Sequence, residues 1–223
     1  ADILFQLGRW QECERECRAG MEWPPAGVAW FSPTLYLGLV LVESRADDEA
    51  SALMGQTMLQ LETMPAGQWS ALVQRAAVSH ALWRGDHQDA LQVAEREWPR
   101  VLETDETSLV ALAASTCLEA AAEAAEAARV TRDIPLLAEA TRLASTVLPE
   151  ARERVAASPL SPGLGARREA ELQLSMAQAN ERRVHGRASA RAWARLARAW
   201  TDQGIPYQAA KCHWWQALAE LRG

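Results

Sequence analysis

The feature that most constrains the fold is a pair of helical segments, joined by one glycine, near the C-terminal end of the sequence. The first segment carries a W-x2-L-A-x2-W pattern formed by Trp193, Leu196, Ala197 and Trp200. The two tryptophans are seven residues apart and therefore share one face of a helix. Gly204 then provides the turn into the second helix. Such a pair cannot bury its apolar face alone, so the pattern predicts an array of stacked helix pairs.

Helical signals extend over most of the chain, and strand signals are almost absent. Ala, Leu, Glu and Arg prevail, whereas alternating β-branched runs bounded by Asn-Gly or Asp-Gly turns are missing. Ser32 with Pro33 is typical of a helix start, and the step from Trp98 to Pro99 predicts a helix end. We therefore expect an all-α fold. The expected helices cover residues 9–20, 34–44, 48–62, 68–84, 88–97, 106–130, 133–157, 166–184, 188–203 and 207–221.

One segment stands out as a loop, and it bears on the domain organisation. The stretch 158–165 is rich in proline, glycine and serine and is the one plausible internal boundary. Residues 1–223 are nevertheless expected to form a single helical-repeat domain. The sequence starts inside a repeat-like unit at residues 1–8, which leads us to expect a fragment of a larger protein.

The charge balance argues against direct binding to nucleic acid. The net charge is −6, whereas binding to a phosphate backbone relies on basic patches, and no helix-turn-helix pattern is visible. The average hides an asymmetry. Residues 1–150 carry 11 basic and 23 acidic groups, a net of −12, and residues 151–223 carry 12 basic and 6 acidic groups, a net of +6. The two halves could interact with each other, with other domains, or only with water.

Targeting and redox signals favour a reduced cytoplasmic protein. We expect no signal peptide and no membrane span, because the longest apolar run, Leu35 to Val42, is too short to cross a bilayer. Four cysteines show no pairing framework. Cys13 and Cys17 lie one helical turn apart, which alone makes neither a metal site nor a disulfide scaffold.

Patterns typical of catalysis are missing. The Gly163-Leu-Gly165 segment lacks the further glycine of a dinucleotide turn and the Gly-Lys-Ser/Thr of a phosphate loop. The four histidines show no H-E-x-x-H spacing, and the Cys212-His213 pair is more typical of helix packing. We therefore expect no enzyme activity, no cofactor and no metal ion in this chain.

Candidate binding residues come from the positions that first helices of such repeats turn toward a concave groove. Arg75, Ser79 and Trp83 occupy these positions in one repeat, and Arg191 and Arg198 in the last. Aromatic and guanidinium groups together would suit an acidic or anionic partner. Arg187, Arg191, Arg195 and Arg198 form a stripe along one helix face, and a solvated face is the more frequent role of such a stripe.

Most of the ten tryptophans are expected to have structural roles. Trp193 and Trp200 are assigned to core packing. Trp10 and the Trp214-Trp215 pair are assigned to contacts between neighbouring helices.

The C-terminal third of the chain resembles a known group of helical repeats. The pattern at residues 193–200 is similar to the opening of a tetratricopeptide repeat. A longer set of positions resembles the helical-repeat region of large ATP-binding LuxR-type transcriptional regulators, the bacterial relatives of the maltose regulator. These positions are Trp193, Trp200, Gly204-Ile205-Pro206-Tyr207, Ala210, Trp215-Gln216-Ala217, Ala219 and Leu221. The resemblance is good over residues 166–223 and loose over residues 1–165.

This resemblance implies a right-handed superhelix of antiparallel helix pairs, built from degenerate tetratricopeptide-like repeats. It also implies a parent protein with an N-terminal nucleotide-binding domain and a C-terminal DNA-binding domain. The repeat region would then bind a protein partner or a small-molecule inducer, contact the other domains of the parent, and control self-assembly. It would bind neither nucleic acid nor membrane. A general interaction scaffold beside a nucleotide cyclase or kinase module is the alternative, and an enzyme with an unrecognised helical site is a third possibility.

Overall fold

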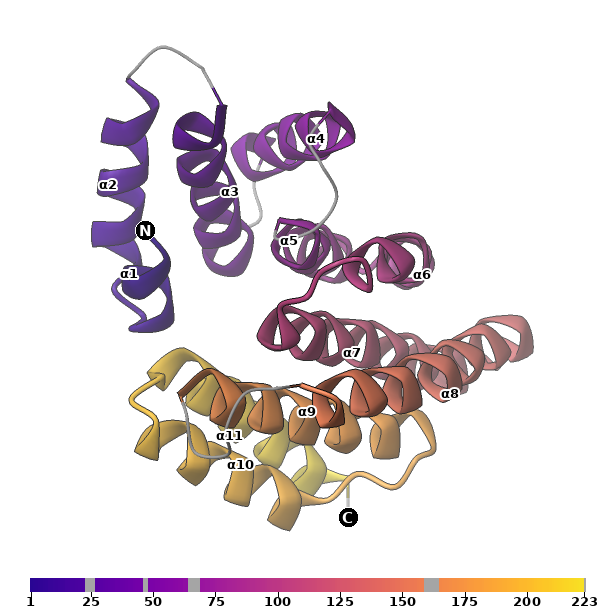
Figure 1. Ribbon diagram of the computed structural model, residues 1–223. Helices are drawn as coiled ribbons and strands as arrows, with labels where there is room; N and C mark the ends of the chain where they lie inside the picture. Colours follow the sequence, from indigo (N-terminus) through magenta and orange to yellow (C-terminus); the bar gives the residue numbers. More distant parts are fainter. Residues whose placement is uncertain (23–26, 46–47, 64–68, 159–164, 223) are drawn as a thin grey trace.

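The computed structural model describes residues 1–22, 27–45, 48–63, 69–158 and 165–222, and these residues form eleven α-helices and no β-strand (Figure 1). The all-α prediction is confirmed for this part of the chain. The helices are α1 (Asp2–Gln6), α2 (Trp10–Met21), α3 (Gly27–Ser44), α4 (Asp48–Thr63), α5 (Ser70–Trp83), α6 (His87–Val101), α7 (Thr107–Thr131), α8 (Ile134–Ala156), α9 (Gly165–Val184), α10 (Ala190–Asp202) and α11 (Pro206–Leu221).

Caps and glycine turns place several helix ends where the sequence predicts them. The Asp86 carboxylate accepts a hydrogen bond from the Asp89 amide at 3.0 Å and starts α6. Asp133 caps α8 in the same way, at 3.0 Å from the Leu136 amide. Both side chains satisfy amides that the helix itself leaves without a partner. Gly204 has a φ of +71° in the turn before α11, a conformation that glycine adopts without a steric cost.

Three prolines lie inside helices of the described residues, Pro33, Pro99 and Pro149, and the helix boundaries predicted from Pro33 and Pro99 are wrong. α3 already begins at Gly27, so Pro33 is not its first residue. The Pro33 ring packs so close to Gly20 that a Cβ atom there would lie 3.0 Å from the proline Cγ atom. This contact with α2 offsets part of the cost of a proline in a helix.

The second of these prolines, Pro99, fails to stop α6, which continues to Val101. Trp98 is buried, and its Nε1 atom donates a hydrogen bond to a Glu150 carboxylate oxygen of α8 at 2.7 Å. Because tertiary packing holds Trp98 in place, the local preference of a residue before proline for extended backbone is overridden. Residue 68, where the expected helix 68–84 begins, lies outside the described residues.

The helices form an arc. Each helix packs on the next one in the chain. In addition, α3 contacts α5, α5 contacts α7, and α7 contacts α9. Figure 1 shows α4, α6 and α8 on the outer side of this row. The curvature brings α1 against α11, so that the first and last helices of the chain meet.

The Ala-rich helix α7 occupies the centre of the largest core cluster. Its length and composition would allow a membrane crossing, although the sequence predicts no membrane span. However, 72% of the apolar 18-residue stretch of this helix is buried inside the protein, as is usual for the core helix of a helical domain. Alanine side chains let its neighbours approach closely, since they take little space.

The largest buried cluster includes residues from both sides of the predicted loop boundary. Ala177 and Val184 of α9 belong to the same buried cluster as the alanines of α7. Residues 159–164 lie outside the described residues, but the helices on either side of them are packed together. The last two helices form another cluster with Leu172, Met176 and Ala179 of α9, in which Trp193 and Trp200 are fully buried.

Candidate binding groove

A groove of about 510 Å³ lies between helices from distant parts of the chain. It is lined by Trp10 of α2, Glu43 of α3, Ser79, Leu82 and Trp83 of α5, Glu119 and Glu123 of α7, and Tyr207, Ala210, Lys211, Trp214 and Trp215 of α11. The closure of the arc by α11 therefore creates the groove. Its volume is in the range of about 300–1,000 Å³ that is typical of small-molecule sites.

Two of the lining tryptophans are unusually exposed. Trp83 retains 61% of its accessible surface, and Trp214 retains 62%. They come from α5 and α11, which are far apart in the sequence, yet both line the same groove. Large aromatic groups gathered and left open at one place are a common mark of a binding surface.

The floor of the groove is an aromatic cluster that joins both ends of the chain. The Tyr207 ring lies 5.2 Å from the Phe5 ring and 5.5 Å from the Trp10 ring, measured between centroids. The Arg75 guanidinium carbon lies 5.0 Å from the Phe5 centroid and 5.3 Å from the Tyr207 centroid. These distances allow cation–π attraction, so Arg75 of α5 holds α1 and α11 together.

Two polar atoms in this cluster make no hydrogen bond to the described residues: Nη2 of Arg75 and the hydroxyl of Tyr207. Both side chains are more than nine-tenths buried. Burial also raises the pKa of Tyr207 to about 12, so its hydroxyl stays protonated near neutral pH. Buried polar groups are normally paired, and unpaired ones at a groove point to a missing partner.

The polar wall is formed by charges of both signs. The Lys211 ammonium lies 2.7 Å from a Glu119 carboxylate oxygen. Burial lowers the pKa of Lys211, but Glu119, Tyr207 and Glu43 together outweigh this effect, so the pKa is raised overall. Glu43, on the opposite side, accepts a hydrogen bond from the Ser79 hydroxyl at 3.2 Å.

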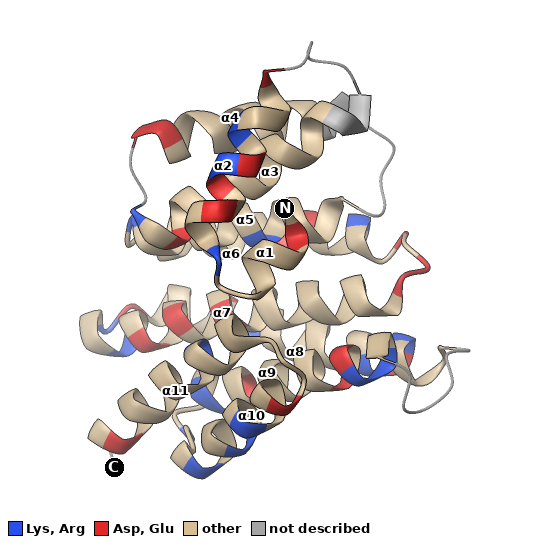
Figure 2. Cartoon of the chain, turned by 90° about the vertical axis from the view of Figure 1, so that its left-hand side faces the viewer, with Lys and Arg blue, Asp and Glu red and all other residues tan. Residues whose placement is uncertain are grey.

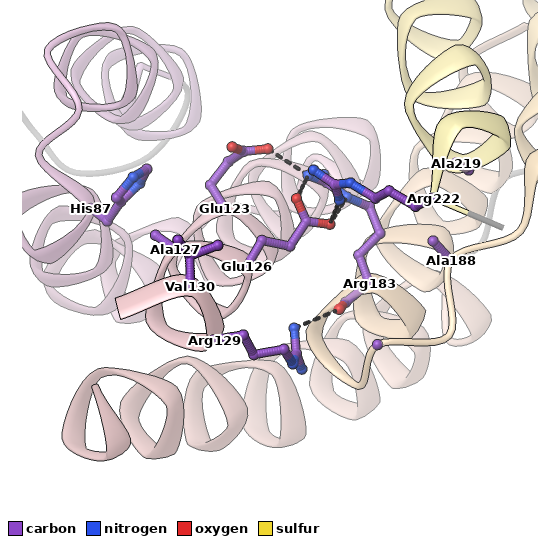
Figure 3. Close-up of a pocket in the computed structure, with 11 residues that line it drawn as sticks. His87, Glu123, Glu126, Ala127, Arg129, Val130, Arg183, Ala188, Ala219 and Arg222 are labelled. Carbon is purple, nitrogen blue, oxygen red and sulfur yellow. Dashed lines mark hydrogen bonds and ion pairs between the residues drawn. The ribbon is translucent and has the colours of Figure 1, made fainter. Parts of the chain in front are cut away.

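A second hollow of about 690 Å³ adjoins the groove and shares Glu123 with it (Figure 3). Its centre is Arg183, only 2% exposed, which pairs with Glu123 and Glu126. Near the C-terminal end of the chain, Nη1 of Arg222 lies 2.7 Å from Oε1 of Glu126. Arg129 donates a hydrogen bond to the Arg183 carbonyl oxygen at 3.3 Å.

The charges in this second hollow are largely satisfied by one another. The Arg183 guanidinium also lies 3.6 Å from the centroid of the Trp215 ring, so the same side chain joins α7, α9 and α11. We therefore assign the hollow to structure and the groove to function. In the described part of the chain, no three His, Cys, Asp or Glu side chains gather in a way that could hold a metal ion.

The structure brings together some of the predicted binding residues and separates others. Ser79 and Trp83 line the groove, and Arg75 is buried directly beneath it rather than exposed on its surface. Arg191 and Arg198 are exposed on α10 and do not line the groove. Figure 2 shows basic residues along α10, on the outside of the bundle.

Sequence reasoning missed several groove residues. Glu43, Lys211 and Tyr207 carry no signal of their own, because only the fold brings α11 to the same groove as α3, α5 and α7. The expectation that Trp214 and Trp215 both seal helix contacts holds for Trp215, which is buried, but is wrong for Trp214. Adjacent residues of a helix point about 100° apart, so two neighbouring tryptophans already indicate that one of them is exposed.

Comparisons with known proteins gave no match: no protein-family model, no curated protein and no solved structure is similar to this chain.

Proposed function

We propose that this chain is the sensor and interaction region of a multidomain bacterial transcriptional regulator in the cytoplasm. In this proposal the helices form a right-handed superhelix of degenerate tetratricopeptide-like pairs, similar to the repeat region of LuxR-type regulators. The chain binds a small-molecule inducer or a protein partner and has no catalytic activity of its own. It acts on an ATP-hydrolysing domain and a DNA-binding domain elsewhere in the parent, whose self-assembly it controls.

The packing of the last helix pair supports the repeat assignment. Trp193, Ala197 and Trp200 are fully buried, as the repeat pattern requires of these positions. Gly204 provides the turn, and Ala209 is buried in the same cluster. Helix pairs that stack in this way present extended concave surfaces, which repeat proteins commonly use for binding.

One observation carries the sensing role: the groove is closed by helices from both ends of the arc. The walls come from α2, α3, α5 and α7 on one side and from α11 on the other. A ligand that contacts both walls binds the closed arc more tightly than a more open one. It therefore shifts the equilibrium toward the closed arc by the difference between its binding free energies for the two arrangements. Because Arg75 also links α1 to α11, a change in the groove is transmitted to both ends of the chain.

The complete reading frame that encodes this chain provides the test. We expect it to encode a phosphate-binding loop before the repeat region and a recognition helix after it. The purified full-length protein should hydrolyse ATP and bind an operator, whereas the isolated chain should do neither. A frame that lacks both domains, or ATP turnover by the isolated chain, would overturn the proposal.

A further inference from the structure

The groove also indicates the chemical class of its ligand. We propose that it binds a small organic cation, an amine or quaternary ammonium compound with an apolar body, with Glu43 as the counterion and Trp83 and Trp214 as the aromatic walls. This inference rests on the proposed function, since it names the ligand class of the same site.

The exposed tryptophans provide the first argument. Indole has the strongest attraction for cations among aromatic side chains, because its ring faces carry negative potential. Other rings in the groove are already engaged: Trp215 lies under Arg183 at 3.6 Å, and Trp10 stacks on Phe5 with centroids 6.0 Å apart. Trp83 and Trp214 have no such partner among the described residues and are more than half exposed, so their faces are open to a ligand.

The balance of charge provides the second argument. Three carboxylates line the groove, on Glu43, Glu119 and Glu123, against a single lining cation, Lys211. Lys211 is paired with Glu119, and Glu123 is paired with Arg183. Glu43 forms no ion pair with a described residue and accepts only the hydrogen bond from Ser79.

Arg75, the remaining cation, is near enough for its charge and that of Glu43 to attract, but it forms no ion pair with Glu43. It lies under the rings of Phe5 and Tyr207 and is 4% exposed. Its charge acts on Glu43 but also on Glu169, a partly buried carboxylate beyond the groove. Among the lining side chains, three carboxylates face one ammonium group, and Glu43 is the carboxylate without an ion pair, so the lining favours a cationic ligand over an anionic one.

The Tyr207 hydroxyl is the third and independent observation. It is buried near the Arg75 guanidinium, makes no hydrogen bond of ordinary geometry to the described residues, and belongs to a side chain that lines the groove. A ligand with a hydroxyl or carbonyl group besides its charged head would satisfy this donor. The groove volume of about 510 Å³ favours a small molecule over a folded partner as the occupant.

Binding of choline, compared with that of its uncharged isostere 3,3-dimethylbutan-1-ol, tests the proposal on the intact chain. The two probes have the same shape and hydroxyl, so isothermal titration calorimetry with tryptophan fluorescence isolates the effect of the charge. We expect choline to bind about tenfold more tightly than the isostere. Glu43→Gln should remove that preference without weakening the isostere, and Trp83→Ala and Trp214→Ala should each weaken choline binding several-fold.

Matched controls separate the groove from the general charge and fold of the chain. Glu103→Gln removes an exposed carboxylate outside the groove, and the double variant Arg191→Ala with Arg198→Ala removes two exposed cations. Neither change should affect choline binding, and circular dichroism should show unchanged helicity in every variant.

The results that would overturn the proposal are distinct from those that would overturn the proposed function. Equal binding of the two probes, no binding of choline or tetraethylammonium at millimolar concentration, or stronger binding of acetate would exclude a site for organic cations. Tighter binding of an arginine-containing peptide than of any small cation would replace the small ligand with a basic protein segment. If choline binds as expected but the full-length protein lacks an ATP-hydrolysing or DNA-binding domain, the site stands and the regulator role fails.

Discussion

Replacing Arg183 with methionine tests whether the junction between α7, α9 and α11 holds the closed arc together. Methionine keeps most of the length and apolar volume of the side chain but removes its charge. The change deprives Glu123 of its ion-pair partner and Glu126 of one of two, and it removes the cation from the face of Trp215. The loss therefore falls on three helices at once.

The structure allows an estimate of the cost. Removing one partner of a buried ion pair typically costs about 3–5 kcal/mol. Here the two carboxylates keep 25% and 17% of their side-chain exposure, and Arg222 still pairs with Glu126, so the cost should be near the lower limit. We expect a loss of about 3 kcal/mol in the free energy of unfolding. For a chain of this length, this corresponds to a fall of about 6–12 °C in Tm.

Urea denaturation followed by circular dichroism measures the effect. The triple variant Arg183→Met, Glu123→Gln, Glu126→Gln should recover part of the loss, because it leaves no buried charge without a partner. Arg222→Ala, which removes a half-exposed arginine, should cost less than about 1 kcal/mol. If Arg183→Met changed the free energy of unfolding by no more than Arg222→Ala does, the reasoning about a buried charged junction would be refuted.

Two further changes test the packing and the electrostatics of other regions. Trp200→Ala should lower the free energy of unfolding by about 3–5 kcal/mol, because the ring is fully buried and its Nε1 atom lies 3.1 Å from the Met176 sulfur; an unchanged Tm would show that this helix face is assigned wrongly. Glu169→Gln should stabilise the chain at pH 7, because burial, with the charge of Asp2, raises the pKa of Glu169 in the folded state. That gain should shrink as the pH falls through the raised pKa of Glu169 towards the ordinary value of about 4.3, below which the glutamate is protonated in both the folded and the unfolded state. Thermal melts over this pH range measure the gain, and a gain of constant size would contradict the assignment.

The sequence determined the helices because their signals are local. Asp86 and Asp133 cap helices where the sequence places them, and Gly204 turns the chain between α10 and α11. The spacing of Trp193 and Trp200 was sufficient to predict which face of α10 is buried. These features depend on residues within a few positions of one another, so periodicity and capping preferences reveal them.

Local signals were misleading where tertiary contacts compensate for an unfavourable residue. Pro33 predicted a helix start and Pro99 a helix end, yet both lie within helices. Pro33 is packed against α2, and the neighbour of Pro99, Trp98, is anchored to α8 by its hydrogen bond to Glu150. The contacts that outweigh the local preference come from other helices, which the sequence near each proline does not reveal.

The groove was decided by the tertiary structure alone. Ser79 and Trp83 are one helical turn apart, so the sequence placed them on one face, but it offered no means to pair them with Glu43, Lys211 or Trp214. The same limit applies to Arg75, whose burial depends on rings brought from the two ends of the chain. Which charges meet, and which remain unpaired, depends on how far the arc closes, and that closure is the sum of many small packing angles between successive helices.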